Sequence, residues 1–281
     1  MKLYTIETGF FKLDGGAMFG VVPKVIWNKL NPADDNNLCT WAMRCLLIEH
    51  EDKLILIDTG MGNKQSEKFF SYYSPHGEAN LEKSINEAGF SLSDVTDVIL
   101  THLHFDHCGG AVRWDDNKTH LIPTFSNAIY WMHETHLQSA LHPNPREKAS
   151  FLSENIVPLI EQNKVKFVKN NLFVLPEITF EVCYGHTESM LLPIIQYKNK
   201  EIIYCADLFP SAAHLPLNFV MGYDIRPLDV MSEREKILKR ALSNNSYLFF
   251  EHDKEIELVS VKENENGRVV VDEVFKILEV G

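Results

Sequence analysis

The chain has 281 residues, of which 45% are hydrophobic and 23% charged, as in a folded globular protein of one large or two small domains. Its formal net charge of −12 argues against nucleic-acid binding, which needs a Lys/Arg stripe that the sequence lacks. No stretch approaches membrane-spanning length, and the N-terminus carries Glu7 before any long apolar run. We therefore expect a cytoplasmic protein without a signal peptide or a membrane partner.

Five cysteines occur in the chain, at positions Cys39, Cys45, Cys108, Cys183 and Cys205. They form no CxxC pair, and their odd number favours reduced thiols over a disulfide framework. Cys108 and Cys205 stand beside candidate metal ligands, but we interpret both as small buried apolar residues rather than as ligands.

The first predicted strand covers residues 3–11, and a Gly-rich loop follows at residues 14–23. This loop carries Met18 and Phe19, and Trp27 lies shortly after it. Loops hold large apolar side chains either where they pack into a core or where they line a pocket. Met18, Phe19 and Trp27 are therefore candidates for a substrate-pocket wall, with ordinary core packing as the alternative.

Two strands are predicted at residues 40–49 and 53–58, joined by a hairpin turn at residues 50–52. The second strand ends at Asp58, beside the Gly-rich turn of Gly60 and Gly62. A carboxylate in this position is suited to orient a metal-bound imidazole from behind. The alternative is that Asp58 caps its own turn. A helix is expected at residues 81–89.

The segment that follows residues 98–100 concentrates metal-capable side chains after a short buried strand. His102 and His104 are two apart, so extended backbone points both to one face, whereas Asp106 and His107 need a turn to converge. The glycines at 109 and 110 allow close packing of the next segment. Imidazole and carboxylate together suit zinc, with iron or manganese as alternatives.

The second half of the chain returns to strands after a helical insertion near residues 132–162, which either forms a lid or covers a sheet face. Strands are predicted at residues 165–168, 172–175, 178–182, 192–197, 202–205 and 247–251. A helix is predicted at residues 232–243, with Ser232 as N-cap and Glu235 completing a capping box. Strands in both halves with helices between them predict two packed sheets flanked by helices, without an obvious linker.

Three strands of the second half end at a metal-capable residue: His186, Asp207 and His252. Each alone is a weak signal, because a polar residue after a strand is usually a cap or a satisfied hydrogen-bonding group. Together with the first motif they complete a set of five histidines and two aspartates. Seven ligands suit two ions better than one.

These motifs resemble the metallo-β-lactamase superfamily, through His102-x-His104-x-Asp106-His107, Gly185-His186-Thr187, Asp207 and His252. The resemblance spans nearly the whole chain. Within the superfamily the chain looks most like the branch that contains the N-acyl homoserine lactonases and related lactone or ester hydrolases. Supporting stretches lie at residues 13–20, 57–60 and 250–253.

The resemblance implies an α+β fold, a four-layer αββα sandwich formed by one domain over residues 1–281. It implies two divalent ions, zinc above all: His102, His104 and His186 hold the first, Asp106, His107 and His252 the second, and Asp207 bridges both. A hydroxide between the ions would attack a lactone or ester, and Asp106 would pass a proton to the leaving alkoxide. The expected partner is therefore a small molecule, and a homodimer is left open.

Two positions depart from the lactonase branch. Pro210 stands where relatives carry a tyrosine whose hydroxyl assists the substrate carbonyl. Either Tyr223 or His214 takes that role, or no residue does and the metals alone stabilise the oxyanion. Residues 185–190 also lack the Pro-Gly turn and the second histidine of the family loop. Alternatives within the fold are thioester or phosphoester hydrolysis, and a non-catalytic metal-containing binding protein is an alternative of another class.

Overall fold

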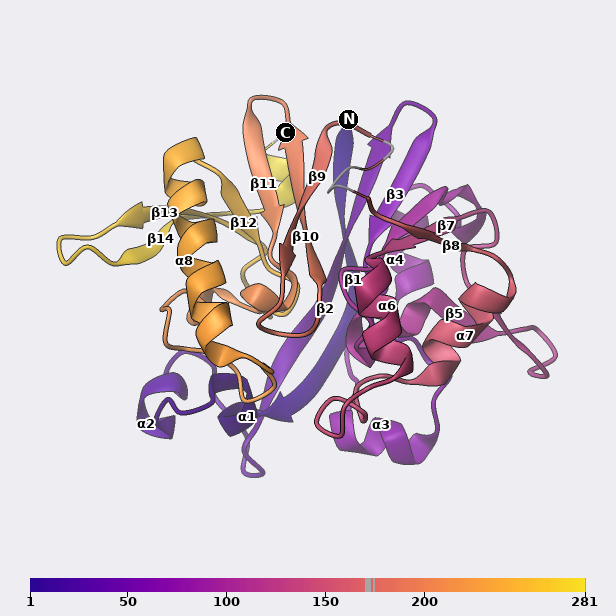
Figure 1. Ribbon diagram of the computed structural model, residues 1–281, viewed down its shortest axis with the longest axis horizontal. Coiled ribbons are helices and arrows are strands. Elements are labelled where there is room, and N and C mark those ends of the chain that lie inside the picture. Colours follow the sequence, from indigo (N-terminus) through magenta and orange to yellow (C-terminus); the bar gives the residue numbers. More distant parts are fainter. Residues whose placement is uncertain (170–172, 174, 281) are drawn as a thin grey trace. The chain divides into compact units, whose positions relative to one another are not determined.

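The computed structural model describes residues 1–169, 173 and 175–280 (Figure 1). The chain divides into two compact units. Unit 1 comprises Met1–Gly9 and Met43–Asn170, and unit 2 comprises Phe10–Ala42 and Asn171–Gly281. The division falls inside two long strands, β1 (Lys2–Asp14) and β2 (Leu38–His50).

Unit 1 is built on a six-stranded sheet with the order β1-β2-β3-β4-β7-β8. β2 and β3 are antiparallel, whereas β3, β4, β7 and β8 run parallel to one another. The strands after β2 are β3 (Lys53–Ile57), β4 (Asp97–Ile99), β7 (Ile129–Met132) and β8 (Val165–Phe167), and a separate hairpin consists of β5 (Val112–Trp114) and β6 (Leu121–Pro123). The helices are α3 (Glu67–Tyr73), α4 (Leu81–Glu87), α5 (Phe105–Cys108), α6 (Glu134–Leu141) and α7 (Ser153–Glu161), with 3-10 turns at Leu92–Asp94 and Gly109–Ala111.

The core of unit 1 forms between the sheet and its helices. The apolar side chains of β3 and β4 are buried, as expected for strands that are covered on both faces, whereas β7 alternates between the buried Tyr130 and Met132 and the partly buried Ile129 and Trp131. Ile156 and Leu159 of α7 belong to the same cluster, and α7 packs against β5 and β6. Of the two roles left open for the helical insertion, this packing matches a segment that covers the core.

Unit 2 contains a second six-stranded sheet with the order β14-β13-β12-β11-β10-β9. Its strands are β9 (Ile178–Cys183), β10 (Met190–Tyr197), β11 (Lys200–Tyr204), β12 (Tyr247–Phe249), β13 (Leu258–Glu263) and β14 (Val269–Phe275). Its helices are α1 (Gly15–Phe19), α2 (Lys24–Trp27) and α8 (Pro227–Asn244), with 3-10 turns at Ala206–Leu208, Ala212–His214 and Ile277–Glu279. The long helix α8 packs on β13 (Figure 1).

Strand direction in unit 2 brings three loops to one edge of the sheet. β9 and β11 are both antiparallel to β10, and β12 is parallel to β11. The carboxyl ends of β9, β11 and β12 therefore lie at the same edge. The loops that carry His186, Asp207 and His252 begin there.

Most of the predicted strands and helices are confirmed, and three expectations need comment. The helix predicted to begin at Ser232 begins at Pro227 instead, because proline fits the first helical position, and Ser232 lies inside α8 with its hydroxyl bonded to the Leu228 carbonyl. The loop expected at residues 14–23 contains the short helix α1, capped by Asp14. Of the strand expected at residues 172–175, residues 172 and 174 lie outside the described ones, and Phe173 and Leu175 are not in a strand. No helix of the described residues is both long and apolar enough to cross a membrane.

Candidate metal centre

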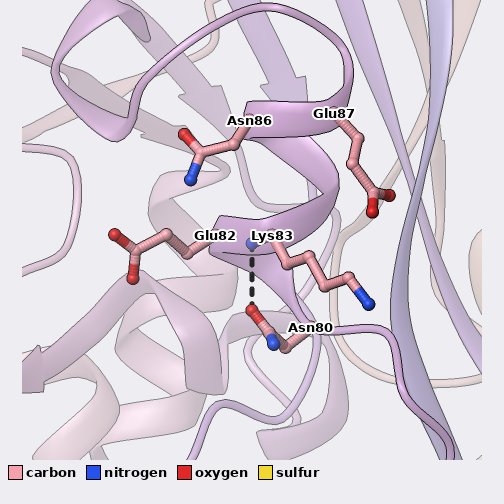
Figure 2. A pocket seen from close by; sticks show the side chains of 5 residues that line it. All are labelled: Asn80, Glu82, Lys83, Asn86 and Glu87. Carbon is pink, nitrogen blue, oxygen red and sulfur yellow. Dashed lines mark hydrogen bonds between the residues drawn. The ribbon is translucent and has the colours of Figure 1, made fainter.

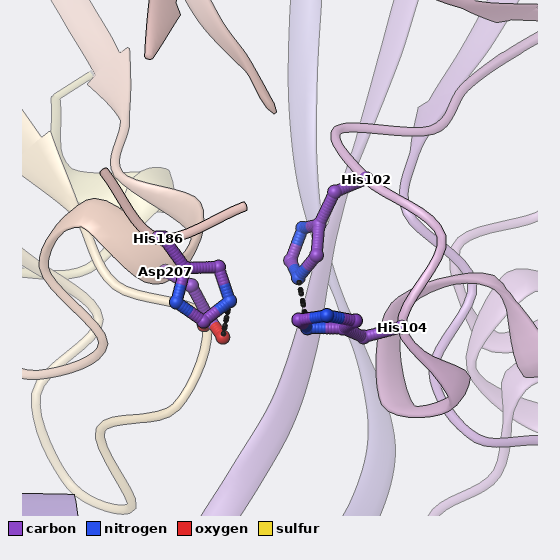
Figure 3. A group of neighbouring side chains, drawn as sticks. All are labelled: His102, His104, His186 and Asp207. Carbon is purple, nitrogen blue, oxygen red and sulfur yellow. Dashed lines mark hydrogen bonds and ion pairs between the residues drawn. The ribbon is translucent and has the colours of Figure 1, made fainter. Parts of the chain in front are cut away.

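His102 and His104 leave β4 in extended backbone and turn their rings toward one another (Figure 3). His102 Nε2 lies 3.1 Å from His104 Nδ1, and both side chains are buried. Two nitrogen ligands of a tetrahedral zinc ion, each roughly 2.0–2.1 Å from the metal, lie about 3.3 Å apart. The spacing in this pair therefore fits the two-residue chelation predicted from the sequence.

Asp106 and His107 lie on the single-turn helix α5, which provides the turn that adjacent ligands require. His107 Nε2 lies 3.8 Å from Asp106 Oδ2. The glycines after α5 allow a close approach of the chain that follows β3: a Cβ on Gly109 would lie 2.0 Å from the Met61 carbonyl oxygen, and one on Gly110 would lie 2.1 Å from that of Thr59. Because these two positions are glycines, the ligand-bearing helix α5 can lie close against the segment that follows β3.

Unit 2 contributes a carboxylate shared by two imidazoles. Asp207 Oδ2 lies 3.1 Å from His186 Nε2, and Asp207 Oδ1 lies 3.0 Å from His252 Nε2. All three side chains are buried, and Figure 3 shows the contact of Asp207 with His186. The Asp207 carboxylate therefore offers a different oxygen to each of the two imidazoles.

Four of the five imidazoles have a hydrogen-bond partner on the ring nitrogen that faces away from these contacts, and the fifth, His104, has the Glu147 carboxylate within ion-pair distance of it. The pairs are His102 Nδ1 with Thr101 Oγ1 at 3.1 Å, His104 Nε2 with Glu147 Oε1 at 3.9 Å, His107 Nδ1 with Asp58 Oδ2 at 3.2 Å, His186 Nδ1 with Asp224 Oδ1 at 2.9 Å and His252 Nδ1 with the Ala42 carbonyl at 2.7 Å. Metal-bound histidines usually donate their second ring N–H to a carboxylate or carbonyl. The donor set and its surroundings in each unit therefore fit a divalent ion.

Asp58 has the environment predicted for an orienting carboxylate. It faces His107 Nδ1 and also accepts hydrogen bonds from the Thr101 amide at 2.8 Å and the Thr101 hydroxyl at 2.6 Å. Its φ of 57° places it in the left-handed region, where the chain turns out of β3. The side chain thus binds the loop before the first histidine and not its own turn.

Asp224 and Glu147 are the outer partners that the sequence analysis missed. Asp224 precedes α8, and besides facing His186 it accepts a hydrogen bond from the Met221 amide at 2.8 Å. Glu147 lies before α7 and is held by Asn144. Neither follows a buried strand, so the pattern that identified the ligands does not mark them.

The charge around His186 is set by its two carboxylate neighbours. Burial lowers the pKa of His186, but Asp207 and Asp224 outweigh this effect and raise it to about 10. A metal cation bound to the His186 imidazole replaces a proton, so acid pH opposes metal binding there.

The substrate-pocket candidates of the N-terminal segment pack together in unit 2. The Phe19 ring stacks on Trp27 at 5.4 Å between centroids and on His214 at 4.6 Å, and Met18 is buried beside them. His214 Nε2 contacts the Met18 carbonyl at 3.0 Å, and its Nδ1 contacts the Ser211 hydroxyl at 2.8 Å. These contacts are those of core residues, so the pocket-wall role of Met18, Phe19 and Trp27 stays a prediction.

The two residues considered as replacements for the missing tyrosine differ in their surroundings. Burial lowers the pKa of His214 to about 3, so its ring is neutral, and both of its nitrogens already have partners. Tyr223 is 37% exposed and directly precedes Asp224, the partner of His186. Pro210 accepts the His252 amide hydrogen bond through its carbonyl at 3.0 Å.

The cysteines have the properties expected of buried thiols. All five are reduced thiols and are buried. Burial raises the pKa of Cys108 to about 12, and its Sγ donates to the Leu103 carbonyl at 3.3 Å. Burial also raises the pKa of Cys205.

A hollow on the surface of unit 1 lies along α4, away from the predicted ligands in the sequence. It is lined by Asn80, Glu82, Lys83, Asn86 and Glu87 (Figure 2). Asn80 caps the helix, because its side-chain oxygen accepts a hydrogen bond from the Lys83 amide at 3.0 Å. These side chains belong to one helix and its cap, and no predicted site residue is among them.

Comparison with known proteins agrees with the sequence motifs. The sequence model of the metallo-beta-lactamase superfamily matches residues 44–252. An N-acyl homoserine lactonase from Bacillus thuringiensis is 24% identical over 271 residues, which cover 91% of this chain and 94% of that protein. The crystal structure of a probable metal-dependent hydrolase from Staphylococcus aureus aligns with a TM-score of 0.88 and 26% identity, over 98% of this chain and 96% of that one.

A further solved structure, AidC, is described as a dizinc quorum-quenching lactonase in complex with a product. It aligns with a TM-score of 0.77 and 24% identity, over 98% of this chain and 95% of the other, a likeness that shows the fold. All seven predicted ligands are among the side chains of this chain that could hold a metal ion. The chain belongs to the metallo-beta-lactamase superfamily and has its α+β fold, with the features of a metal-dependent hydrolase related to the lactonases.

Proposed function

We propose that the protein is a dinuclear metal-dependent hydrolase that cleaves lactones or esters. The observation that carries the proposal is Asp207, whose two carboxylate oxygens each face a different imidazole, those of His186 and His252. A carboxylate divided in this way is the expected bridge of a two-metal centre. The alignment with the N-acyl homoserine lactonase covers most of both chains and supports a lactone or ester as the substrate class.

The proposed ligand sets follow the roles implied by the family. His102, His104 and His186 would hold the first ion, Asp106, His107 and His252 would hold the second, and Asp207 would be shared by both. The family match runs through residues of both units, so the proposal treats residues 1–281 as one catalytic domain. Zinc suits a set of imidazole and carboxylate donors, with iron or manganese as alternatives.

Two such ions, when bound, supply a nucleophile at neutral pH and polarise the substrate carbonyl. The chain's own residues then position and protonate. Asp106 lies beside His107 on α5, with its Oδ2 3.8 Å from His107 Nε2, and we assign it the proton transfer to the leaving alkoxide. Asp58, Asp224 and Glu147 hold the imidazoles in the orientation that ligation requires.

Tyr223 is the better candidate for the hydroxyl that Pro210 does not provide. Its ring is partly exposed. Its neighbour Asp224 accepts a hydrogen bond from the Met221 amide, which fixes the backbone on either side of Tyr223. His214 is buried with both nitrogens engaged, so it has no N–H left to offer a substrate carbonyl. A phenol on the residue that directly precedes Asp224, the partner of His186, fits the role of a carbonyl donor.

A hydrolysis screen on zinc-loaded protein tests the proposal. The substrates are N-acyl homoserine lactones, simple lactones, aryl esters, a thioester and a phosphodiester, and the matched control is His102→Ala. We expect turnover of lactones and esters that is lost in the control. Turnover of the thioester or phosphodiester alone would assign the chain to the corresponding alternative, and zinc binding without turnover of any substrate would indicate a binding protein.

A further inference from the structure

Two neighbouring charged residues of α8, Glu233 and Arg234, contact two different ligand loops of unit 2. Glu233 Oε1 accepts a hydrogen bond from the Tyr184 amide at 2.6 Å, and its Oε2 accepts one from the Gly185 amide at 3.2 Å. Gly185 directly precedes the predicted ligand His186. One carboxylate therefore binds two successive backbone N–H groups at the approach to this histidine.

The loop that carries Gly185 lies directly against the start of α8. A Cβ on Gly185 would lie 2.4 Å from the Val230 backbone nitrogen, so any other residue would push the loop away from the helix. The Arg226 amide donates to the Gly185 carbonyl at 2.8 Å, and the Ile225 amide donates to the His186 carbonyl at 3.2 Å. The position of α8 thus fixes the position of His186.

Arg234 makes the corresponding contacts with the loop of Asp207. Its side chain is fully buried, with Nε donating to the Leu208 carbonyl at 2.7 Å and one terminal nitrogen donating to the Phe219 carbonyl at 2.8 Å. The guanidinium lies over the Phe209 ring, 5.2 Å from its centroid. Leu208 and Phe209 directly follow Asp207, so Arg234 binds both residues after the predicted bridging carboxylate.

A buried guanidinium is costly, and an apolar side chain of similar volume often stabilises a fold better. Burial lowers the pKa of Arg234 to about 10, with the carboxylates of Asp224 and Asp207 opposing the shift, so the group is cationic at neutral pH. A buried cation that binds the carbonyl directly after Asp207 therefore has a role other than filling space. Its planar set of donors can reach two carbonyls at fixed angles, which a lysine ammonium does less well.

We propose that Glu233 and Arg234 are positioning residues that set the spacing of His186 and Asp207. Consecutive helical residues point about 100° apart, so one turn of α8 reaches both loops at once. Glu233 fixes the backbone before His186, and Arg234 fixes the backbone after Asp207. This inference rests on the proposed metal-binding role of both ligands and concerns metal affinity, not the choice of substrate.

The test measures zinc affinity by competition with a chelator in the full-length protein, together with the absorption spectrum of the cobalt-substituted form. The variants are Glu233→Gln, Arg234→Met and Arg234→Lys. We expect Glu233→Gln and Arg234→Met to weaken zinc binding roughly tenfold or more, as removal of outer partners of metal ligands does. The cobalt spectrum should shift with them, and Arg234→Lys should recover part of the affinity.

Two controls on the same helix separate positioning from general stability. Glu235→Gln removes an exposed carboxylate paired with Lys239, and Arg240→Met removes an arginine paired with Glu201. Both should keep wild-type zinc affinity, the second even if its unfolding midpoint falls. If Arg234→Met does not fold, Glu233→Gln and Arg234→Lys decide the question.

Wild-type zinc affinity and cobalt spectra in the folded variants would overturn the positioning role. That result differs from failure of the proposed function, in which the wild-type protein binds zinc but hydrolyses no substrate. In that second case a loss of zinc affinity in Glu233→Gln would still support the inference.

Discussion

Asp58 reaches two parts of the unit 1 ligand segment with one carboxylate. Oδ1 accepts a hydrogen bond from the amide of Thr101, the residue directly before His102. Oδ2 accepts a hydrogen bond from the Thr101 hydroxyl and faces His107 Nδ1. An imidazole held in this way keeps its other nitrogen directed at a metal, and the carboxylate raises its basicity. Loss of Asp58 should therefore affect the ligands more than the sheet.

We predict that Asp58→Ala lowers metal affinity or activity by roughly ten- to a hundredfold. The measurement is zinc affinity by chelator competition alongside hydrolysis of the best substrate. Asp116→Ala is the matched control, because that carboxylate is 96% exposed. An Asp58→Ala protein with full metal content and full activity would show that the carboxylate serves only the turn after β3.

Tyr223 and His214 can be separated by their surroundings. We predict that Tyr223→Phe lowers kcat/KM for an unactivated lactone by about a hundredfold with metal content intact, because loss of one carbonyl donor has an effect of this size. An aryl ester with a good leaving group should lose less. His214→Asn should lower the unfolding midpoint rather than act selectively on the unactivated substrate, because His214 packs against Phe19 and binds Ser211. Equal rates for Tyr223→Phe and wild type on the lactone would leave carbonyl stabilisation to the metals alone.

At the scale of elements, α8 is joined to the sheet of unit 2 by a buried carboxylate. Glu201 of β11 accepts hydrogen bonds from Arg240 at 2.9 and 2.7 Å and from the Ser246 hydroxyl at 2.7 Å. Burial raises the pKa of Glu201, but the bonds from Arg240 and Ser246 outweigh it and lower the pKa from 4.5 to about 2. This contact lies on the same helix as Glu233 and Arg234 but nearer its C-terminal end, and Arg240 joins the helix there to β11.

The lowered pKa of Glu201 predicts a defined pH dependence of stability. Because the folded pKa lies below the unfolded one, the stabilisation is complete above about pH 4.5 and is lost as the pH falls toward 2. Glu201→Gln should therefore reduce the free energy of unfolding at pH 7 by about 1–3 kcal/mol, with a smaller deficit at pH 3. Urea unfolding of zinc-free protein at both pH values measures this.

Glu235→Gln is the control for the pH experiment, since an exposed pair contributes little. A deficit in Glu201→Gln that is equal at pH 7 and pH 3 would mean that lost packing, and not the charge, is responsible.

At the scale of the whole molecule, the proposal requires ligands from both halves of the sequence. Unit 1 supplies His102, His104, Asp106 and His107, and unit 2 supplies the rest. Ligand binding to the folded state adds stability that depends on ligand concentration. Metal should therefore raise the thermal unfolding midpoint of the protein.

We predict close to two zinc ions per chain, because seven ligands suit two ions that share Asp207. Elemental analysis of metal-replete protein measures the stoichiometry, and calorimetry measures the midpoint with and without zinc. Asp207→Ala should lower the metal content, whereas Asp272→Ala, at an exposed ion pair with Lys262, should not. A content of one ion that Asp207→Ala leaves unchanged would rule out the bridge.

The sequence by itself determined the type of protein and the identity of the candidate ligands. Four of the candidate ligands lie within six consecutive positions: His102, His104, Asp106 and His107. The other three, His186, Asp207 and His252, follow apolar strands, so spacing and hydrophobic pattern are enough to find the set. Both sheets were predicted for the same reason. The start of α8 was misplaced because Ser232 offers a capping signal that Pro227, five residues earlier, overrides.

Only the tertiary structure decided which groups support the ligands. The supporting contacts join residues that are 26 to 49 positions apart in the sequence, and no periodic pattern marks them. They are Asp224 with His186, Glu147 with His104, Glu233 with Tyr184, and Arg234 with Leu208. It also showed that Met18, Phe19 and Trp27 are buried, with the Phe19 ring stacked on both Trp27 and His214. A ligand at a strand end is marked by local sequence, whereas its outer partner depends on which distant segment the folded chain brings to it.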